Sequence, residues 1–318
     1  MIAIGVALLA ALAGCGTDDA GSGADTPSIV VTTNILGDVV SELVGDGAEV
    51  LTIMPVGTDP HEFQPSARQV DQILDADALI VNGAGFEHGL VDVIESAADE
   101  GVPTFAAISA VDVLALTDDH ADHDDETDDT DGEEHGDLAA DDVDPHFFTD
   151  PARMARAAEG IVEFLGATVD GLDTDALAST AEEYLAALRS ADAAAEEVLA
   201  VVDADDRVLV TNHDVFGYFA DRYDFEIVGA VIPGGSTSEA VSVADLAELA
   251  DTVRERGVPA IFADTSAPDR VARTLASEVG DIEVVELYTE SLGDDESPAG
   301  TYLDMVATNA ARIAAALG

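Results

Sequence analysis

Apolar residues follow two patterns that alternate along the chain from residue 28 onwards. Short apolar runs, many of them rich in valine and isoleucine, are separated by longer segments in which apolar residues recur three and four positions apart. The first pattern predicts buried β-strands and the second predicts amphipathic helices. The expected strands are 28–33, 49–54, 77–82 and 103–108 in the first part of the chain and 207–211, 226–231, 259–264 and 282–288 in the second.

Strands that alternate with helices form mainly parallel sheets with helices on both faces, so the sequence predicts an α/β fold. One helix is expected at 35–44. Another opens at Ser66, where Gln69 three residues later completes the pattern of a capping box.

A long amphipathic segment, 174–202, separates the two groups of strands. At a rise of 1.5 Å per residue it makes a helix of roughly 40 Å, which suits a strut between two lobes. We therefore predict two βα lobes, 28–173 and 203–318, joined by one rigid linking helix. The apolar positions of this helix are Leu177, Ala181, Tyr184, Leu188, Ala191, Ala195, Val198 and Val202.

Residues 118–144 interrupt the pattern of the first lobe. Fifteen of these 27 residues are Asp or Glu, and apolar residues are few. Such a segment cannot bury enough apolar surface to fold, so we expect a solvated, disordered insert. Its histidines, His120, His123 and His135, are expected to bind metal weakly and as auxiliary sites.

The charge of the chain excludes one class of partner. There are 67 Asp and Glu against 11 Lys and Arg, and every one of the 11 is arginine. A surface this acidic repels phosphate backbones, so nucleic acid is not expected as a partner. Adaptation to high salt or a biased genome explains such acidity without any function, although an acidic surface also concentrates cations.

The first residues indicate export. Residues 2–13 form an apolar run that is too short to span a bilayer comfortably, and it leads into Leu12-Ala13-Gly14-Cys15. This pattern resembles a bacterial lipoprotein signal, although the usual basic residues before the run are missing. We predict that 1–14 is a signal peptide, that Cys15 carries lipid, and that 15–27 is a flexible tether. The protein is then anchored by lipid at the cell surface or in the periplasm.

Four candidate metal ligands follow predicted strands or precede predicted helices. His61 and His146 each lie in an Asp-Pro-His-x-Phe motif, where proline stiffens the backbone before the histidine. His213 follows the first strand of the second lobe, and Glu290 follows the last. Ligands in parallel α/β sheets bind where strand ends meet loops, so two donors from each lobe indicate one site between the lobes.

Three imidazoles and one carboxylate form a complete shell for a divalent cation, most naturally Zn²⁺. A single histidine at a strand end is more often structural than a ligand. The combination with an export signal and a histidine-containing insert favours metal binding.

The same residues carry a resemblance to the zinc- and manganese-binding lipoproteins of metal ABC transporters, the cluster A-I family of solute-binding proteins. It extends from about Ser28 to the end of the chain. The matching segments are Gly57-Thr-Asp-Pro-His-Glu-Phe-Gln-Pro-Ser66, Asp144-Pro-His-Phe-Phe-Thr-Asp-Pro151, His213-Asp-Val-Phe-Gly-Tyr-Phe219 and Gly300-Thr-Tyr-Leu-Asp-Met305 with Asn309.

The resemblance implies two α/β lobes joined by a rigid helix, with the metal held between them by His61, His146, His213 and Glu290. It also implies an ABC permease as the partner, and we expect a monomer. Two positions differ from the family pattern. Glu290 stands where Asp is common, and Phe147-Phe148 stands where many members have Trp.

Three alternatives remain open at this point. Manganese is possible in place of zinc, because a bidentate Glu290 raises the coordination number. A secreted zinc hydrolase also uses three protein ligands, but the chain has no His-Glu-x-x-His motif and Glu290 would close the shell. An adhesin or structural lipoprotein would make the histidines incidental. His88 lies near a family motif but matches no ligand position, and no functional role is expected for it.

Overall fold

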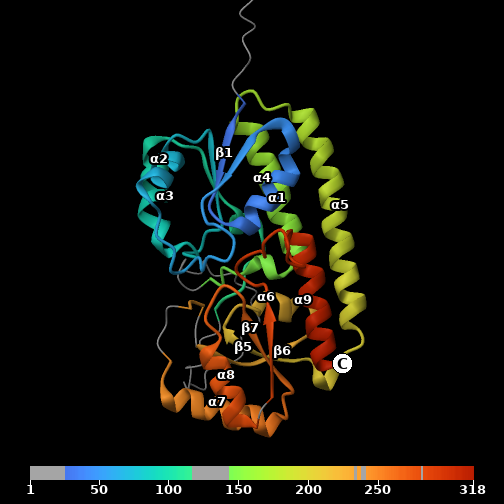
Figure 1. Ribbon diagram of the computed structural model, residues 1–318. Coiled ribbons are helices and arrows are strands. Elements are labelled where there is room, and N and C mark those ends of the chain that lie inside the picture. Colours follow the sequence, from blue (N-terminus) through green and yellow to red (C-terminus); the bar gives the residue numbers. More distant parts are fainter. Residues whose placement is uncertain (1–25, 117–142, 233–234, 238–240, 281) are drawn as a thin grey trace, which may run out of the picture.

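The computed structural model describes residues 26–116, 143–232, 235–237, 241–280 and 282–318. They form two lobes stacked one above the other, with a long helix along the side of both (Figure 1). The predicted signal peptide with Cys15, most of the tether, and His120, His123 and His135 of the acidic insert lie outside the described residues. No helix within the described ranges combines the length and apolar character needed to cross a membrane.

A parallel sheet with strand order β2-β1-β3-β4 forms the centre of the first lobe. Alternate residues of β1 point to opposite faces, as strand geometry requires. Ile29 and Val31 pack with α1 and α4, whereas Val30 packs with α2 and α3. The elements are β1 (Ser28–Val31), α1 (Asn34–Val44), η1 (Gly45–Gly47), β2 (Glu49–Thr52), α2 (Ala67–Leu74), β3 (Ala78–Val81), η2 (His88–Leu90), α3 (Val91–Glu100), β4 (Thr104–Ala106), η3 (Ala107–Ala110), η5 (Phe147–Thr149) and α4 (Pro151–Thr168).

The second lobe repeats the arrangement of the first. Its sheet is also parallel, with strand order β6-β5-β7-β8, so the two lobes share a topology that their sequences do not reveal. Its elements are η6 (Ala204–Asp206), β5 (Val208–His213), α6 (Gly217–Tyr223), β6 (Glu226–Ile232), α7 (Val243–Arg256), β7 (Ala260–Asp264), α8 (Arg270–Val279), β8 (Glu283–Leu287) and α9 (Tyr302–Leu317). The predicted α/β fold with mainly parallel sheets is confirmed.

The linking helix α5 (Thr174–Leu199) runs along both lobes, with α9 beside its lower half (Figure 1). The predicted apolar face is buried at Leu177, Ala181, Tyr184, Leu188 and Ala195. The prediction is wrong for Val198, which is 39% exposed, because the helix buries Leu199 instead. Val202 continues this face beyond the helix end, in a turn where its N–H donates to the carbonyl of Leu199. One apolar core extends from the first sheet across α5 and α9 to the second sheet, so the two lobes are packed together rather than tethered.

The end of the acidic insert belongs to the folded chain. Val143 forms an antiparallel bridge with Ala115, and the Asp144 N–H donates to the carbonyl of Leu114. Asp144 is buried. The expectation of a solvated insert as far as residue 144 is therefore wrong for its last two residues, because pairing and burial hold them in place.

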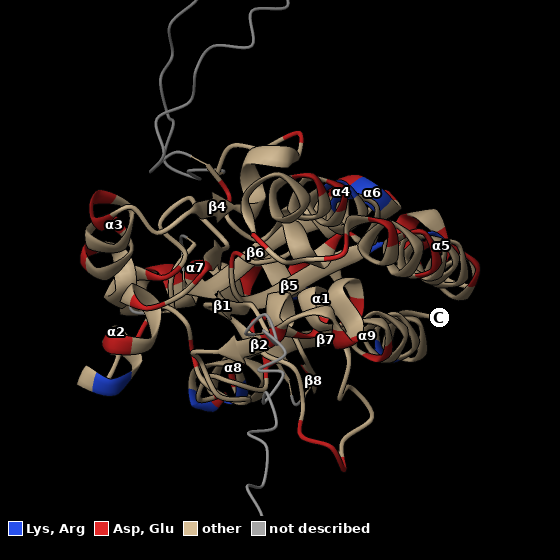
Figure 2. Ribbon diagram, turned by 90° about the horizontal axis from the view of Figure 1, so that it is seen from above, with Lys and Arg blue, Asp and Glu red and all other residues tan. Residues whose placement is uncertain are grey.

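Acidic residues cover the outer helices of both lobes, whereas arginines are confined to a few places (Figure 2). Most described arginines are paired with carboxylates. Arg222 contacts Asp192 at 2.6 Å, and Arg256 pairs with Glu226. The Arg256–Glu226 pair is exposed and contributes little stability, and the surface keeps a large excess of negative charge.

Candidate metal centre

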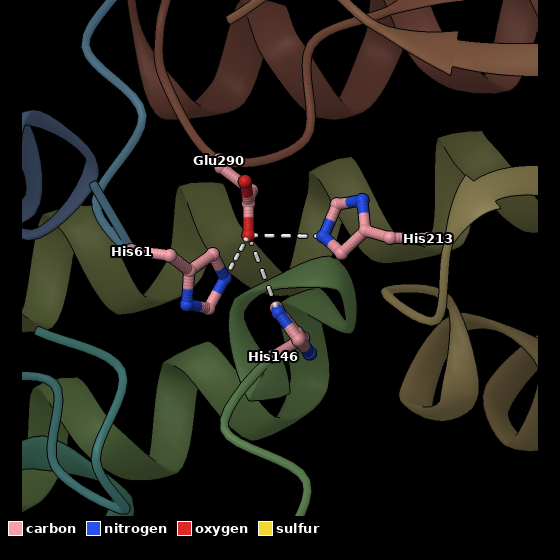
Figure 3. A group of neighbouring side chains, drawn as sticks. All are labelled: His61, His146, His213 and Glu290. Atoms are coloured by element: carbon pink, nitrogen blue, oxygen red, sulfur yellow. Dashed lines mark hydrogen bonds and ion pairs between the residues drawn. The ribbon is translucent and has the colours of Figure 1, made fainter. Parts of the chain in front are cut away.

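Four side chains from separate segments meet at the boundary between the lobes. Each offers one ligand atom, and these atoms all lie within 4.8 Å of one another. Figure 3 shows the three imidazoles pointing toward a single oxygen of the glutamate. The residues are His61, His146, His213 and Glu290, the same four that the sequence indicated.

The first Asp-Pro-His motif fixes His61 by a short local turn. The Asp59 carboxylate accepts a hydrogen bond from the His61 N–H at 2.9 Å, which is the geometry of an Asx turn. The other oxygen of Asp59 accepts from the Thr237 hydroxyl of the second lobe at 2.6 Å. The motif therefore aims the histidine and also contacts the opposite lobe.

The second motif repeats this turn and adds a contact to the ring. Asp144 Oδ1 accepts from the His146 backbone N–H at 2.9 Å and lies 2.8 Å from His146 Nδ1. The ring therefore donates through Nδ1 and directs the Nε2 lone pair into the cluster. Asp144 is held in turn, because the Tyr218 hydroxyl donates to its carbonyl at 2.7 Å.

The remaining two donors come from the second sheet. His213 is the last residue of β5, at the end of a fully buried strand. Glu290 follows β8 in a loop that is fixed to the first lobe. Asn34 Oδ1 accepts from the Leu292 N–H at 2.8 Å, and Ser291 Oγ accepts from the Gly57 N–H at 2.7 Å.

The distances within the cluster are close to those of a tetrahedral metal shell. Glu290 Oε1 lies 2.7 Å from His61 Nε2, 3.3 Å from His146 Nε2 and 3.0 Å from His213 Nε2. Ligand bonds of about 2.0–2.1 Å in tetrahedral geometry place neighbouring ligand atoms roughly 3.3 Å apart. The Glu290 oxygen lies among the three nitrogens, and the four ligand atoms are spread over at most 4.8 Å, so this oxygen would move outward to admit the ion.

Burial makes this arrangement costly without a cation. His146 and His213 are 0% exposed, Glu290 is 1% exposed and His61 is 5% exposed. Within the described part of the chain, His146 Nε2, which faces the cluster, and Glu290 Oε2 lack any hydrogen-bond partner. Buried lone pairs that converge on one point need a proton or a metal ion between them.

The pKa values of the cluster reflect this demand for positive charge. Burial by itself lowers the pKa of the His146 imidazole, but the Asp144 and Glu290 carboxylates outweigh it and raise its pKa to about 10. Burial raises the pKa of the Glu290 carboxyl, yet His213, His61 and His146 together hold its pKa well below the usual range. A metal ion would take over the role of the proton at this point.

Sequence reasoning missed three supports of the site. Asp144 was taken as part of a stiff motif and not as the residue that orients the His146 ring, although an Asp two residues before each histidine was the available signal. The interlobe contact of Asn34 with Ser291 had no sequence signal. Asp264, at the end of β7, is also buried, and burial together with the charge of Glu290 raises its pKa to about 6.

Two parallel-sheet lobes, joined by one long helix and sharing a donor cluster at their boundary, define a solute-binding protein of the two-lobed class. The chain belongs to the ZnuA family, described as the periplasmic component A of the zinc-uptake complex, whose model matches residues 29–316. The predicted family relationship is confirmed.

The relatives that match most of this chain include proteins named for manganese and proteins named for zinc. A manganese-binding lipoprotein MntA of Halalkalibacterium halodurans is 28% identical over 306 residues, covering 96% of this chain and 93% of the relative. The zinc-binding protein TroA of Treponema pallidum is 28% identical over 304 residues, covering 92% and 89%. The solved structure of TroA matches with a TM-score of 0.79 at 27% identity, covering 92% of this chain and 99% of TroA.

Proposed function

We propose that this protein captures a divalent transition metal outside the cytoplasmic membrane and delivers it to the permease of an ABC transporter. His61, His146, His213 and Glu290 hold the metal. The observation that carries the proposal is the convergence of three imidazole Nε2 atoms on one buried carboxylate oxygen. Family membership supports the transport role.

Zinc is the metal we propose. Imidazole-rich tetrahedral sites suit Zn²⁺, whereas Mn²⁺ prefers more oxygen ligands and a higher coordination number. Three nitrogen donors against one carboxylate therefore favour zinc.

Manganese is the second candidate, and two observations favour it. Glu290 Oε2 lacks a hydrogen-bond partner among the described residues, so this carboxylate has a second oxygen available to bind bidentately. Several relatives are named manganese-binding lipoproteins. A competition titration with both ions separates the candidates, because manganese that displaces zinc at comparable concentrations would overturn the zinc assignment.

Mutation of the four ligands tests the site itself. His61→Ala, His146→Ala and His213→Ala should each weaken zinc binding strongly, since each removes a neutral nitrogen donor. Glu290→Ala should weaken it less, because water takes the vacated position. Metal analysis of the native, untagged protein and isothermal titration of each variant provide the measurement. Unchanged affinity in any histidine variant would contradict the assigned ligand set.

We also propose that Cys15 is the mature N-terminus, that it carries lipid and that 15–27 tethers a monomeric protein to the membrane. The lipobox and the lipoprotein names of the relatives support this proposal. One acyl chain gives only marginal anchoring, so diacylation is expected. Mass spectrometry that finds residues 1–20 intact and unmodified on the cell-associated protein would contradict it.

Binding rather than catalysis is the proposed role. A catalytic zinc site keeps one coordination position open for water, whereas four protein donors surround this one. An exchangeable metal-bound water in the loaded protein would favour a hydrolase instead.

A further inference from the structure

A fourth imidazole lies at the outer edge of the cluster. His88 is exposed, and the centroid of its ring lies 5.5 Å from that of buried His61, with the two rings tilted by 59°. This contact is separate from the four ligand atoms, because His88 is not among the residues that converge on Glu290.

The backbone before His88 adopts a conformation that few sequences allow. Gly83, Ala84 and Gly85 all have positive φ, at 92°, 50° and 68°. A positive φ is uncommon for a residue other than glycine, so Ala84 marks a constrained turn. The buried Glu87 carboxylate holds the turn in place. It accepts hydrogen bonds from the Asn82 N–H at 2.6 Å and from the Thr32 hydroxyl at 2.6 Å. These hydrogen bonds hold the loop that positions His88.

The glycines of this loop show what lies against it. A Cβ atom on Gly85 would lie 4.0 Å from the His88 ring, so the ring folds back over this residue. A Cβ atom on Gly89 would lie 2.0 Å from the Phe63 carbonyl oxygen, which only glycine avoids. The segment of His88 is therefore in direct contact with the segment that carries His61.

The four ligand side chains are buried, with at most 1% of each exposed, whereas His88 next to them is exposed. A metal ion that reaches the buried donors has to pass a layer of protein. Among the four ligands, His61 is the one whose ring contacts the exposed imidazole of His88.

We propose that His88 is an outer, transient metal ligand through which the ion exchanges between solvent and the buried site. The inference rests on the proposed function. A hydrated divalent ion first exchanges one water for a ring nitrogen of His88, and then further waters for the inner donors beginning with His61. Each step exchanges one water for one donor. The imidazoles bind as neutral ligands and release any proton on the ligating nitrogen to solvent, whereas the Glu290 carboxylate offsets one of the two charges of the ion. The ligand class is divalent transition metals with affinity for imidazole, and not Mg²⁺ or Ca²⁺.

Exchange kinetics test this role. Mutation of a residue on the exchange path should change the rates of zinc uptake and release without changing the equilibrium affinity. Zinc uptake and zinc release to a fluorescent chelator are measured by stopped flow for the wild type, His88→Asn and His88→Glu, together with the equilibrium dissociation constant. Asn keeps a polar side chain but is a poor zinc ligand, whereas Glu supplies a ligand again. We expect His88→Asn to slow uptake and release alike by about tenfold at unchanged affinity, and His88→Glu to restore much of both rates.

Three outcomes would overturn the inference. Equal rates in the wild type and His88→Asn, with tight zinc binding retained, would contradict it and leave the proposed function intact. Weaker binding with faster release in His88→Asn would make His88 an equilibrium ligand. Slow exchange in His88→Glu as well would assign the effect to loop structure.

A wild type that binds neither zinc nor manganese would contradict the proposed function itself.

Discussion

At the scale of single residues, the two Asp-Pro-His motifs look alike in sequence but differ in the structure. Both aspartates accept the backbone N–H of the histidine two residues later. Only Asp144 also contacts the imidazole of its own histidine. The same motif is therefore a turn at His61 and a turn plus a ring support at His146.

Asp144→Asn should lower zinc affinity by about 10- to 100-fold, the usual effect of removing a carboxylate that orients a ligating histidine. Asp59→Asn is the matched control, because Asn keeps the turn and Asp59 bonds the backbone N–H of His61 instead of its ring. It should change the affinity little. Isothermal titration of both variants gives the comparison, and equal losses would contradict a special role for the contact of Asp144 with the His146 ring.

Protons and metal compete at the cluster. The raised pKa of His146 predicts the direction in which stabilisation by zinc changes with pH. Its pKa is raised from 6.5 to about 10, so protonated His146 stabilises the metal-free fold fully below pH 6.5 and loses this contribution as the pH rises toward 10. Zinc needs the neutral ring. The rise in melting temperature on adding zinc should therefore be larger at about pH 8 than at about pH 6. Thermal unfolding with and without zinc checks this, and a rise that shrinks with pH would refute it.

At the scale of elements, the loop after β8 is tied to the start of α1. Asn34 accepts from the Leu292 N–H at 2.8 Å and lies 3.1 Å from Ser291 Oγ, so the ligand loop of the second lobe is fixed by a residue of the first. Asn34 is only 8% exposed, and Ser291 is 0% exposed. This buried contact sets the position of Glu290 relative to His61.

Asn34→Ala should lower the free energy of unfolding by about 1–3 kcal/mol, because it leaves a buried N–H unpaired. It should also weaken zinc binding, since Glu290 loses its tie to the first lobe. Asn309→Ala is the control. Asn309 is likewise 8% exposed and bonds both backbone groups of Tyr288, but within the second lobe. Denaturant unfolding and zinc titration are measured for both, and equal zinc affinities would argue against an interlobe role.

At the scale of the whole molecule, the repulsion between acidic residues opposes the packing of the two lobes. The formal net charge is −56, and Figure 2 shows the acidic residues spread over helices of both lobes. Like charges at this density repel within the folded protein. The shared core across α5 and α9 has to hold the lobes together against this repulsion.

Added salt should therefore stabilise the protein. Raising sodium chloride from about 0.01 M to about 1 M shortens the Debye length from roughly 30 Å to 3 Å and screens the repulsion. The melting temperature of the metal-free protein should rise over this range. A melting temperature that falls with salt would indicate that attractive ion pairs dominate.

Deleting 118–142 should leave the main metal site intact. The ends of the deleted segment lie close together, because Ala115 and Val143 form a bridge, and Asp144 stays in place. The deletion should remove weak metal equivalents due to His120, His123 and His135 and retain one tight equivalent. Zinc titration of both proteins measures this, and loss of the tight equivalent would mean that the site is wrongly assigned.

The sequence by itself determined the strands, the parallel α/β class, the linking helix and the four candidate ligands. These follow from local patterns, since apolar spacing specifies strands and helices. His61 and His146 carry a recognisable motif, and His213 and Glu290 follow predicted strands. The sequence did not predict the contact of Asp144 with the His146 ring, because that contact depends on the direction of the two side chains.

Only the tertiary structure decided how the lobes face each other. Asn34 and Ser291 are 257 residues apart, and no local pattern relates them. The shared strand order of the two sheets and the position of His88 beside His61 are likewise absent from the sequence. The physical reason is that these contacts depend on the packing of one lobe against the other, which is set by the whole buried core rather than by neighbouring residues.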